Sequence, residues 1–126
     1  MKPKINKDSV FIGGIEYAPI NSIGIDMANK VDGLKLVMIR TYSAGVHYGY
    51  LKSRNGKEVE LINSVRVWQW SGAASISQLS VDGTTKPNDC KFAVEVPYLI
   101  LTEAIEIIDI TEKAAINLNS VKKWKI

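Results

Sequence analysis

The sequence predicts an α+β fold, in which an antiparallel β-sheet or a partly closed barrel carries two short helices. Two long runs with alternating side chains flank Asn55-Gly56, and an Asn-Gly pair in that setting is the strongest local signal for a β-hairpin. One helix is predicted at 73–80, where Asp82-Gly83 ends it. The other is predicted at 111–118, where Thr111 can cap the first turn.

The remaining segments complete a single domain over residues 1–126. This length is sufficient for a hydrophobic core without disulfide bonds or a structural metal. Residues 1–8 form a basic tail, and residues 9–20 form a small hairpin that turns at Gly13-Gly14. A further short helix is expected around residues 26–30. Leu34–Tyr42 is apolar at nearly every position, which favours a central strand covered on both faces.

The register of the main hairpin follows from its turn. If Asn55 and Gly56 are the two central residues of a type I′ turn, His47 lies opposite Ser64. Strand alternation then separates two faces. The apolar face consists of Val46, Tyr48, Tyr50, Val59, Leu61, Val65 and Val67. The opposite face carries His47, Glu58, Glu60, Ser64, Arg66, Trp68 and Trp70.

Charge and composition exclude several classes of protein. The chain has 16 Lys and Arg against 13 Asp and Glu, a net charge of +3. Much of that excess lies near the two ends, so we expect tail lysines that aid solubility rather than a nucleic-acid stripe. A lone cysteine allows no intrachain disulfide and favours a reducing compartment. No signal peptide or membrane-length apolar run is visible, so we expect a cytoplasmic protein without membrane contact.

Catalytic and metal-binding motifs are also missing from the sequence. One histidine and one cysteine cannot supply the usual zinc ligands, and neither a Walker loop nor a nucleophile elbow is present. A nucleophilic pair of Cys90 and His47 stays open, although no pattern brings the two together. We therefore expect a protein that is not an enzyme and that needs no cofactor or metal.

One group of polar and aromatic residues suggests a binding site for an anionic, aromatic ligand such as a nucleotide. Guanidinium groups match phosphate oxygens, and aromatic rings stack on bases. In the alternative interpretation, the tryptophans form a second core layer beneath the helix at 73–80, and Arg66 is merely ion-paired. Exposed tryptophans would also favour a homo-oligomer. The candidate residues are Arg40, Tyr42, His47, Arg66, Trp68 and Trp70.

The segment MIRTYSAGVHYGYL, residues 38–51, resembles a family of small, uncharacterised bacteriophage proteins. The resemblance implies a phage or prophage origin and a location in the host bacterial cytoplasm, but no activity. Three roles remain open: sequestering a nucleotide immune signal to inhibit a host defence, building the virion as a head-decoration or tail protein, and acting as a small nucleic-acid-binding or enzyme-modulating early protein. The resemblance continues through VRVWQWSGAASISQLSVDGT (65–84), CKFAVEVP (90–97), LTEAIEII (101–108) and the final VKKWKI, and thus includes the core at 34–126.

Overall fold

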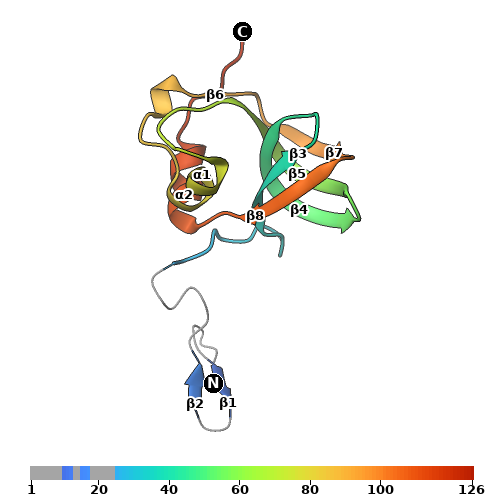
Figure 1. The fold of residues 1–126 in the computed structure, drawn as a ribbon, viewed down its shortest axis with the longest axis vertical. Coiled ribbons are helices and arrows are strands. Elements are labelled where there is room, and N and C mark those ends of the chain that lie inside the picture. The colour runs from blue at the N-terminus through green and yellow to red at the C-terminus, as the bar shows by residue number, and fades with distance from the viewer. Residues whose placement is uncertain (1–9, 13–14, 18–24) are drawn as a thin grey trace.

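The computed structural model describes residues 10–12, 15–17 and 25–126, and it confirms the α+β fold (Figure 1). The two helices are α1 (Ile76–Asp82) and α2 (Glu112–Asn119), and a 3-10 turn covers Pro87–Asp89. The strands are β1 (Val10–Ile12), β2 (Ile15–Tyr17), β3 (Leu36–Thr41), β4 (Val46–Asn55), β5 (Glu58–Gln69), β6 (Lys91–Phe92), β7 (Val96–Leu101) and β8 (Ala104–Asp109).

The main sheet is antiparallel and open, with strand order β6-β5-β4-β3-β8 and with β7 also paired to β5. The long strand β5 therefore has two neighbours on one edge: β7 lies beside its first half and β6 beside its end. Although only Thr102 and Glu103 separate β7 from β8, these two strands pair with β5 and β3 and not with each other. The sheet thus curls without closing into a barrel.

The central hairpin is present, but its turn lies one residue further along than the sequence predicts. Asn55 pairs with Glu58, so Gly56 and Lys57 are the two loop residues. Gly56 has a φ of 62°, whereas Asn55 and Lys57 are not among the described residues with positive φ. A two-residue turn of type II′ needs positive φ only at its first central position, where glycine is preferred. The predicted type I′ turn centred on Asn55-Gly56 is therefore wrong.

His47 lies opposite Arg66 rather than opposite Ser64, because the turn itself is displaced by one residue. The pairing of β4 with β5 is also irregular between Leu51 and Ser53 and between Tyr48 and Tyr50, and these two shifts offset each other. Asn63 has a φ of 51°, the positive value of a residue inserted as a β-bulge. A Cβ atom on Gly49 would lie 3.0 Å from the Ser64 Cα, so this bulge packs closely against a position without a side chain.

The bulge divides the predicted apolar face between two cores. Val59 and Leu61 lie inside the curl of the sheet, whereas Val65 and Val67 face the helices. The core inside the curl consists of Val37, Ile39, Val59, Leu61, Leu101 and Ala104. The core beneath the helices includes Leu36, Met38, Tyr48, Val65, Val67, Leu79, Cys90, Phe92, Ile110, Ala114, Leu118 and Val121.

Both predicted helices form, and they pack together on one side of the sheet (Figure 1). The Ser75 hydroxyl caps α1 by accepting a hydrogen bond from the Gln78 N–H. The Thr111 hydroxyl caps α2 and donates to the Val81 carbonyl, so that one side chain joins the two helices. These caps explain why α1 begins at Ile76 rather than at residue 73.

The segment before β3 does not form the short helix expected around residues 26–30. Met27 forms an isolated β-bridge with Thr111, and the Ala28 N–H donates to the Ile110 carbonyl. The predicted N-terminal hairpin is present as β1 and β2, while the basic tail and the Gly13-Gly14 turn lie outside the described residues. No helix in the described part of the chain is long and apolar enough to cross a membrane.

Candidate functional site

The structure does not assemble the six predicted residues into one site. His47 and Arg66 are direct cross-strand partners. Arg40 lies on the other face of the sheet, because its neighbour Ile39 is the residue paired with His47. The Arg40 Nε donates to a Glu106 carboxylate oxygen at 3.0 Å, an ion pair at the surface.

Tyr42 and Trp70 also lie apart from this pair. Tyr42 is 78% exposed just beyond the end of β3. Trp70 packs against the core beneath the helices, and its indole N–H donates to the Ala73 carbonyl at 3.2 Å. The pairing of β5 with β6 shifts between Val67 and Gln69, so Trp68 is an inserted residue and the alternation changes after it. The alternative interpretation, in which the tryptophans form a second core layer beneath the helices, therefore holds for Trp70.

His47 is buried, with 2% of its surface exposed, and cannot contact a ligand at the surface. Burial, and then the positive charge of Arg66, lower the pKa of His47 from 6.5 to about 4, so the ring is neutral at neutral pH. Among the described residues, neither ring nitrogen of His47 has a hydrogen-bond partner, and the buried Ser64 hydroxyl has none either. Cys90 belongs to the core on the opposite face of the sheet, which rules out the Cys90–His47 pair.

A different arrangement forms around Trp68. Its indole stacks on that of Trp124, with ring centroids 6.2 Å apart and an interplanar angle of 26°. The two side chains remain 58% and 51% exposed. The Lys91 Nζ lies 5.2 Å from the centroid of the Trp124 ring, within the range of a cation–π interaction. Two indoles and an ammonium group thus share one exposed surface.

Backbone contacts hold the C-terminal tail in this position. Val121 is buried beneath the helices, and Lys123 forms a parallel β-bridge with Phe92 of β6. The Trp124 N–H donates to the Phe92 carbonyl at 2.8 Å. The stack therefore depends on main-chain pairing as well as on the rings.

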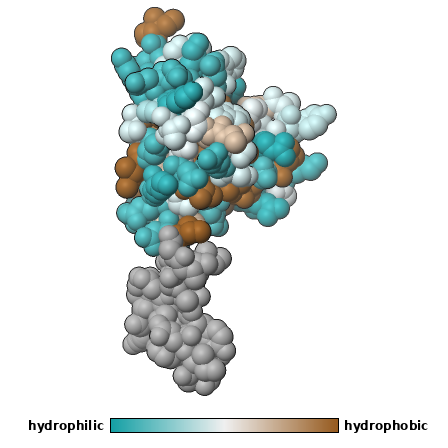
Figure 2. Space-filling view, turned by 60° about the vertical axis from the view of Figure 1, so that its left-hand side comes forward, coloured by the Kyte–Doolittle hydropathy of each residue, from teal (hydrophilic) through white to brown (hydrophobic). Residues whose placement is uncertain are grey.

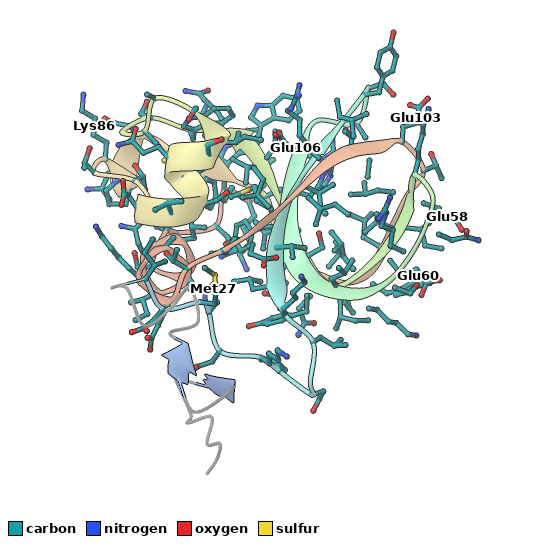
Figure 3. All side chains as sticks on the ribbon, turned by 60° about the horizontal axis from the view of Figure 1, so that its bottom comes forward. Met27, Glu58, Glu60, Lys86, Glu103 and Glu106 are labelled. Atoms are coloured by element: carbon teal, nitrogen blue, oxygen red, sulfur yellow. The ribbon has the colours of Figure 1, made fainter. Side chains whose placement is uncertain are left out.

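A hollow of about 380 Å³ adjoins the stack and shares Lys91 and Trp124 with it. Figure 3 shows Glu58, Glu60 and Glu103 on the opposite side of the molecule from Lys86. Lys86 directly precedes Pro87, one of the residues that line this hollow. Four lysines and no carboxylate line it, so it favours an anion. We call it the lysine hollow, and its lining is Pro87, Asn88, Cys90, Lys91, Lys122, Lys123, Trp124 and Lys125.

Comparison with known protein families places this chain in one of them. The sequence model of DUF6948, a domain of unknown function, matches residues 34–118. The chain belongs to the DUF6948 family. No curated protein and no solved structure matches the chain.

The DUF6948 match extends from the residues before β3 almost to the end of α2. It includes Trp68 and Lys91, whereas Trp124 and the lysines of the tail follow it. The candidate site of this DUF6948 protein thus combines strand residues of the family domain with the segment 119–126. The described residues contain no cluster of His, Cys, Asp and Glu able to hold a metal ion.

Sequence reasoning overlooked the part of the site that the tail contributes. The sequence-based prediction assigns the lysines of the tail to solubility and does not include Trp124 among the candidate residues. The segment KKWK places an aromatic ring between cations, and this pattern is typical of surfaces that bind phosphates and bases. It was the signal in the sequence that could have indicated the site.

Proposed function

We propose that this DUF6948 protein is a non-enzymatic binding protein for an anionic, aromatic ligand of the nucleotide type. The observation that supports this most directly is the lysine hollow, in which four ammonium groups adjoin two exposed, stacked indoles. Ammonium groups attract phosphate, and an indole face accepts a stacked base. These two chemistries side by side match the two halves of a nucleotide.

The arrangement also suggests how such a ligand binds. Trp68 and Trp124 already cover one face of each other, so a base stacks on an outer face of the pair. Phosphate then occupies the lysine hollow beside Trp124. Arg66 precedes Trp68 by two residues, about 7 Å along the strand, and is exposed as an additional cation. His47 contributes no charge, since it is buried and neutral.

The biological role that fits this chemistry is the sequestration of a nucleotide immune signal, by a phage-encoded protein in the host bacterial cytoplasm. The resemblance to small phage proteins and the proposed nucleotide site support it. A virion component, a head-decoration or tail protein, is the second candidate. The exposed apolar side chains beside the helices favour that role, because virion proteins assemble through such surfaces.

Calorimetric titration of linear and cyclic nucleotides, with the matching nucleosides as controls, tests the proposed ligand class. We expect saturable binding of nucleotides and much weaker binding of nucleosides, which lack the phosphate. The double variant Lys122→Ala/Lys123→Ala keeps the backbone bridge to Phe92 and is expected to bind about tenfold more weakly, a change of about 1.4 kcal/mol. Arg66→Ala is expected to have a similar effect if its guanidinium contacts the phosphate.

Lys30→Ala/Lys57→Ala serves as the matched control, because it also removes two lysines, both of them exposed and neither of them lining the lysine hollow. It should leave the affinity unchanged, whereas an equal loss would indicate attraction by net charge alone. If the folded wild type binds none of the nucleotides, the proposal is wrong and the virion role becomes the better one.

A further inference from the structure

A cleft lies between helix α2, the chain segment before β3, and the face of β4 and β5 that is turned toward the helices. It consists of two adjoining hollows of about 360 and 230 Å³, which together have the size of a small-molecule site. The two hollows are continuous because they share the lining residues Val31, Leu36, Tyr50 and Asn119. We call them together the tyrosine cleft. Among its described lining residues, only Lys123 also lines the lysine hollow.

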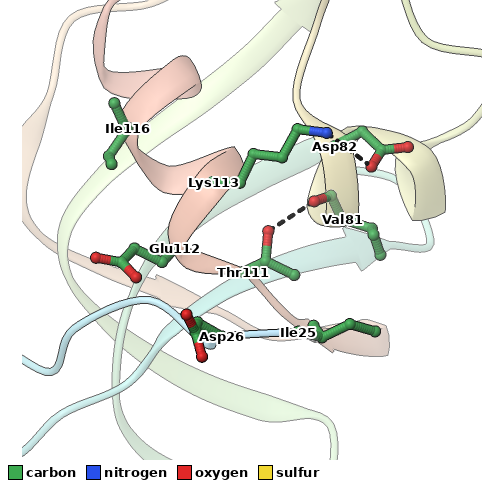
Figure 4. A pocket seen from close by; sticks show the side chains of 8 residues that line it. All are labelled: Ile25, Asp26, Val81, Asp82, Thr111, Glu112, Lys113 and Ile116. Atoms are coloured by element: carbon green, nitrogen blue, oxygen red, sulfur yellow. Dashed lines mark hydrogen bonds and ion pairs between the residues drawn. The ribbon is translucent and has the colours of Figure 1, made fainter. Parts of the chain in front are cut away.

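One wall of the tyrosine cleft is a single face of α2. The helix residues that line the cleft are spaced so that they fall on one side of the helix, and they are Glu112, Ala115, Ile116 and Asn119. Figure 4 draws the neighbouring hollow between α1, α2 and the segment before β3, which Glu112 and Ile116 also border. There Lys113 extends toward Asp82 of α1, with which it forms an ion pair, whereas Glu112 and Ile116 point to another side of α2. Helix α2 thus presents one face to α1 and a second face to the cleft.

The opposite wall is a tight turn in the segment before β3. Val31 and Leu34 exchange two backbone hydrogen bonds, of 3.0 and 2.9 Å. The two central residues, Asp32 and Gly33, have φ values of 54° and 79°, and positive φ at both positions is the mark of a type I′ turn. Main-chain hydrogen bonds also fasten the start of this segment to α2. The cleft is therefore formed before any ligand binds.

The strands contribute Asn63, the inserted residue of the bulge in β5. Its φ of 51° is uncommon for a residue other than glycine, and the surrounding structure has to offset its cost. The bulge turns this side chain into the lining of the cleft, beside Tyr48 and Tyr50. Backbone strain of this kind concentrates at binding sites, where it fixes the direction of a side chain. Asn63 is thus a candidate for direct contact with a ligand.

Most polar groups of the tyrosine cleft are uncharged. The side-chain amides of Asn29, Asn63 and Asn119 can each donate and accept hydrogen bonds, and so can the Tyr50 hydroxyl. The ring of Tyr50 adds an apolar surface among these groups. Figure 2 shows a similar mixture of hydrophobic and hydrophilic side chains, in brown and teal, over the face of the body that it draws. A ligand with both hydroxyl and C–H groups would complement such a lining.

Charge in the tyrosine cleft is low and of both signs. Lys123 partly offsets Glu95 and Glu112, whereas the lysine hollow contains four lysines and no carboxylate. The cleft therefore does not favour an anion. Burial, and then the carboxylate of Glu95, raise the pKa of Tyr48, so its phenol keeps its proton at neutral pH.

We propose that the tyrosine cleft binds an uncharged pyranose sugar. Such a sugar carries hydroxyl groups at its edge and C–H groups on its faces, and the cleft offers a partner for each. The hydroxyls bond to the amides of Asn63 and Asn119, and a C–H face lies against the ring of Tyr50. This site goes beyond the proposed nucleotide function and does not depend on it.

Titration with glucose, galactose, mannose and N-acetylglucosamine, followed in a nitrogen–proton NMR spectrum, tests the cleft. At least one of these sugars should shift the side-chain amide signals of Asn63 saturably, and the spectrum of Asn63→Gly identifies those signals by their absence. The indole signals of Trp68 and Trp124 should stay in place. Glucuronic acid, in which a carboxylate replaces the CH₂OH group of glucose, should bind more weakly than the neutral sugars.

Two variants remove amides from the cleft. Asn63→Gly keeps the positive φ without a steric penalty, and Asn119→Ala shortens an exposed side chain at the end of α2. Each is expected to weaken sugar binding about fivefold or more. Gln69→Ala is the matched control, because it removes an exposed amide of β5 that lies outside the cleft, and it should bind as the wild type does. Circular dichroism verifies that all three variants are folded.

Four results would overturn the proposal. The first is the absence of any shift with all four sugars, and the second is tighter binding of glucuronic acid than of every neutral sugar. The third is a shift of the Trp68 and Trp124 indole signals in place of those of Asn63, which would put the sugar on the tryptophans. The fourth is an unchanged affinity in both cleft variants, or an equal loss in Gln69→Ala.

Discussion

Trp68 and Trp124 stack at a centroid distance of 6.2 Å, although one belongs to strand β5 and the other to the C-terminal tail. The contact joins the DUF6948 domain to a segment outside the family match. It also gives the lysines of that segment a fixed position beside an aromatic surface. The proposed ligand site depends on this junction.

Trp124→Ala should therefore separate binding from folding. The loss of one exposed aromatic pair is expected to lower the free energy of unfolding by only about 1 kcal/mol. Nucleotide affinity should fall about tenfold or more, because both the stack and the position of the hollow are disturbed. Trp124→Phe keeps a ring and should retain most of the affinity. Urea denaturation and calorimetry on the same samples measure both effects, and unchanged affinity in Trp124→Ala would contradict the proposed site.

The central turn offers a test of backbone geometry. Gly56 has a φ of 62°, and a Cβ there would meet no atom within 4 Å, so a substitution acts through the backbone alone. Gly56→Val is expected to lower the free energy of unfolding by about 1–2 kcal/mol. Lys57→Val is the control at the second loop position, where φ is not positive. Equal melting temperatures for the wild type and Gly56→Val would show that the turn is placed incorrectly.

The buried His47 predicts a specific dependence of stability on pH. Its pKa is about 4 in the folded protein and near 6.5 when unfolded. Above pH 6.5 both states are neutral and the group has no effect. As pH falls from 6.5 to 4, the unfolded state binds the proton first, so the free energy of unfolding decreases by as much as about 3 kcal/mol.

His47→Gln removes the titrating imidazole. The pH dependence that the imidazole causes should therefore disappear, even where the substitution also changes the free energy of unfolding at neutral pH. The variant should lose less stability than the wild type between pH 7 and pH 5, as measured by urea denaturation at each pH. Comparison of the two proteins cancels the carboxyl groups, which both share. Parallel stability curves over that interval would mean that the imidazole titrates normally in the fold.

Asn117 links α2 to the loop after α1. Its Oδ1 accepts from the Thr84 N–H at 2.8 Å, and its Nδ2 donates to the Thr84 carbonyl at 2.9 Å. Because Thr84 is buried, Asn117→Ala leaves both of these backbone groups without a partner and should cost about 2 kcal/mol. Asn117→Asp keeps the acceptor for the Thr84 N–H but sets an oxygen against the Thr84 carbonyl, so it should destabilise the fold as well. Chemical denaturation gives both values, and a neutral Asn117→Ala would refute this role.

The sequence predicts those elements of the fold that depend on neighbouring residues, namely the central hairpin and the start of α2. Alternation around Gly56 indicated the hairpin, and Thr111 indicated the start of α2. It could not predict the bulge at Asn63, because an asparagine adopts positive φ there only where the opposite strand has Gly49 to receive it. The division of one predicted apolar face into two cores followed from that single inserted residue.

The candidate site was predictable only in part, for a similar reason. Cross-strand pairing brings His47 and Arg66 together on one hairpin, but alternation cannot show that His47 is buried. Trp68 is an inserted residue, so Trp70 turns toward the helices against the simple pattern. Trp124 reaches the site through a bridge between Lys123 and Phe92, a contact distant in sequence that no periodicity reveals.

The most direct test of the nucleotide site is the indole N–H region of a two-dimensional nitrogen–proton NMR spectrum during titration with a nucleotide such as AMP. The three tryptophans give three signals, and Trp70 is an internal control because its N–H is bonded to the Ala73 carbonyl beneath the helices. We predict saturable shifts of the Trp68 and Trp124 signals and a stationary Trp70 signal. No shift of Trp68 and Trp124 at saturating nucleotide would contradict the proposed site.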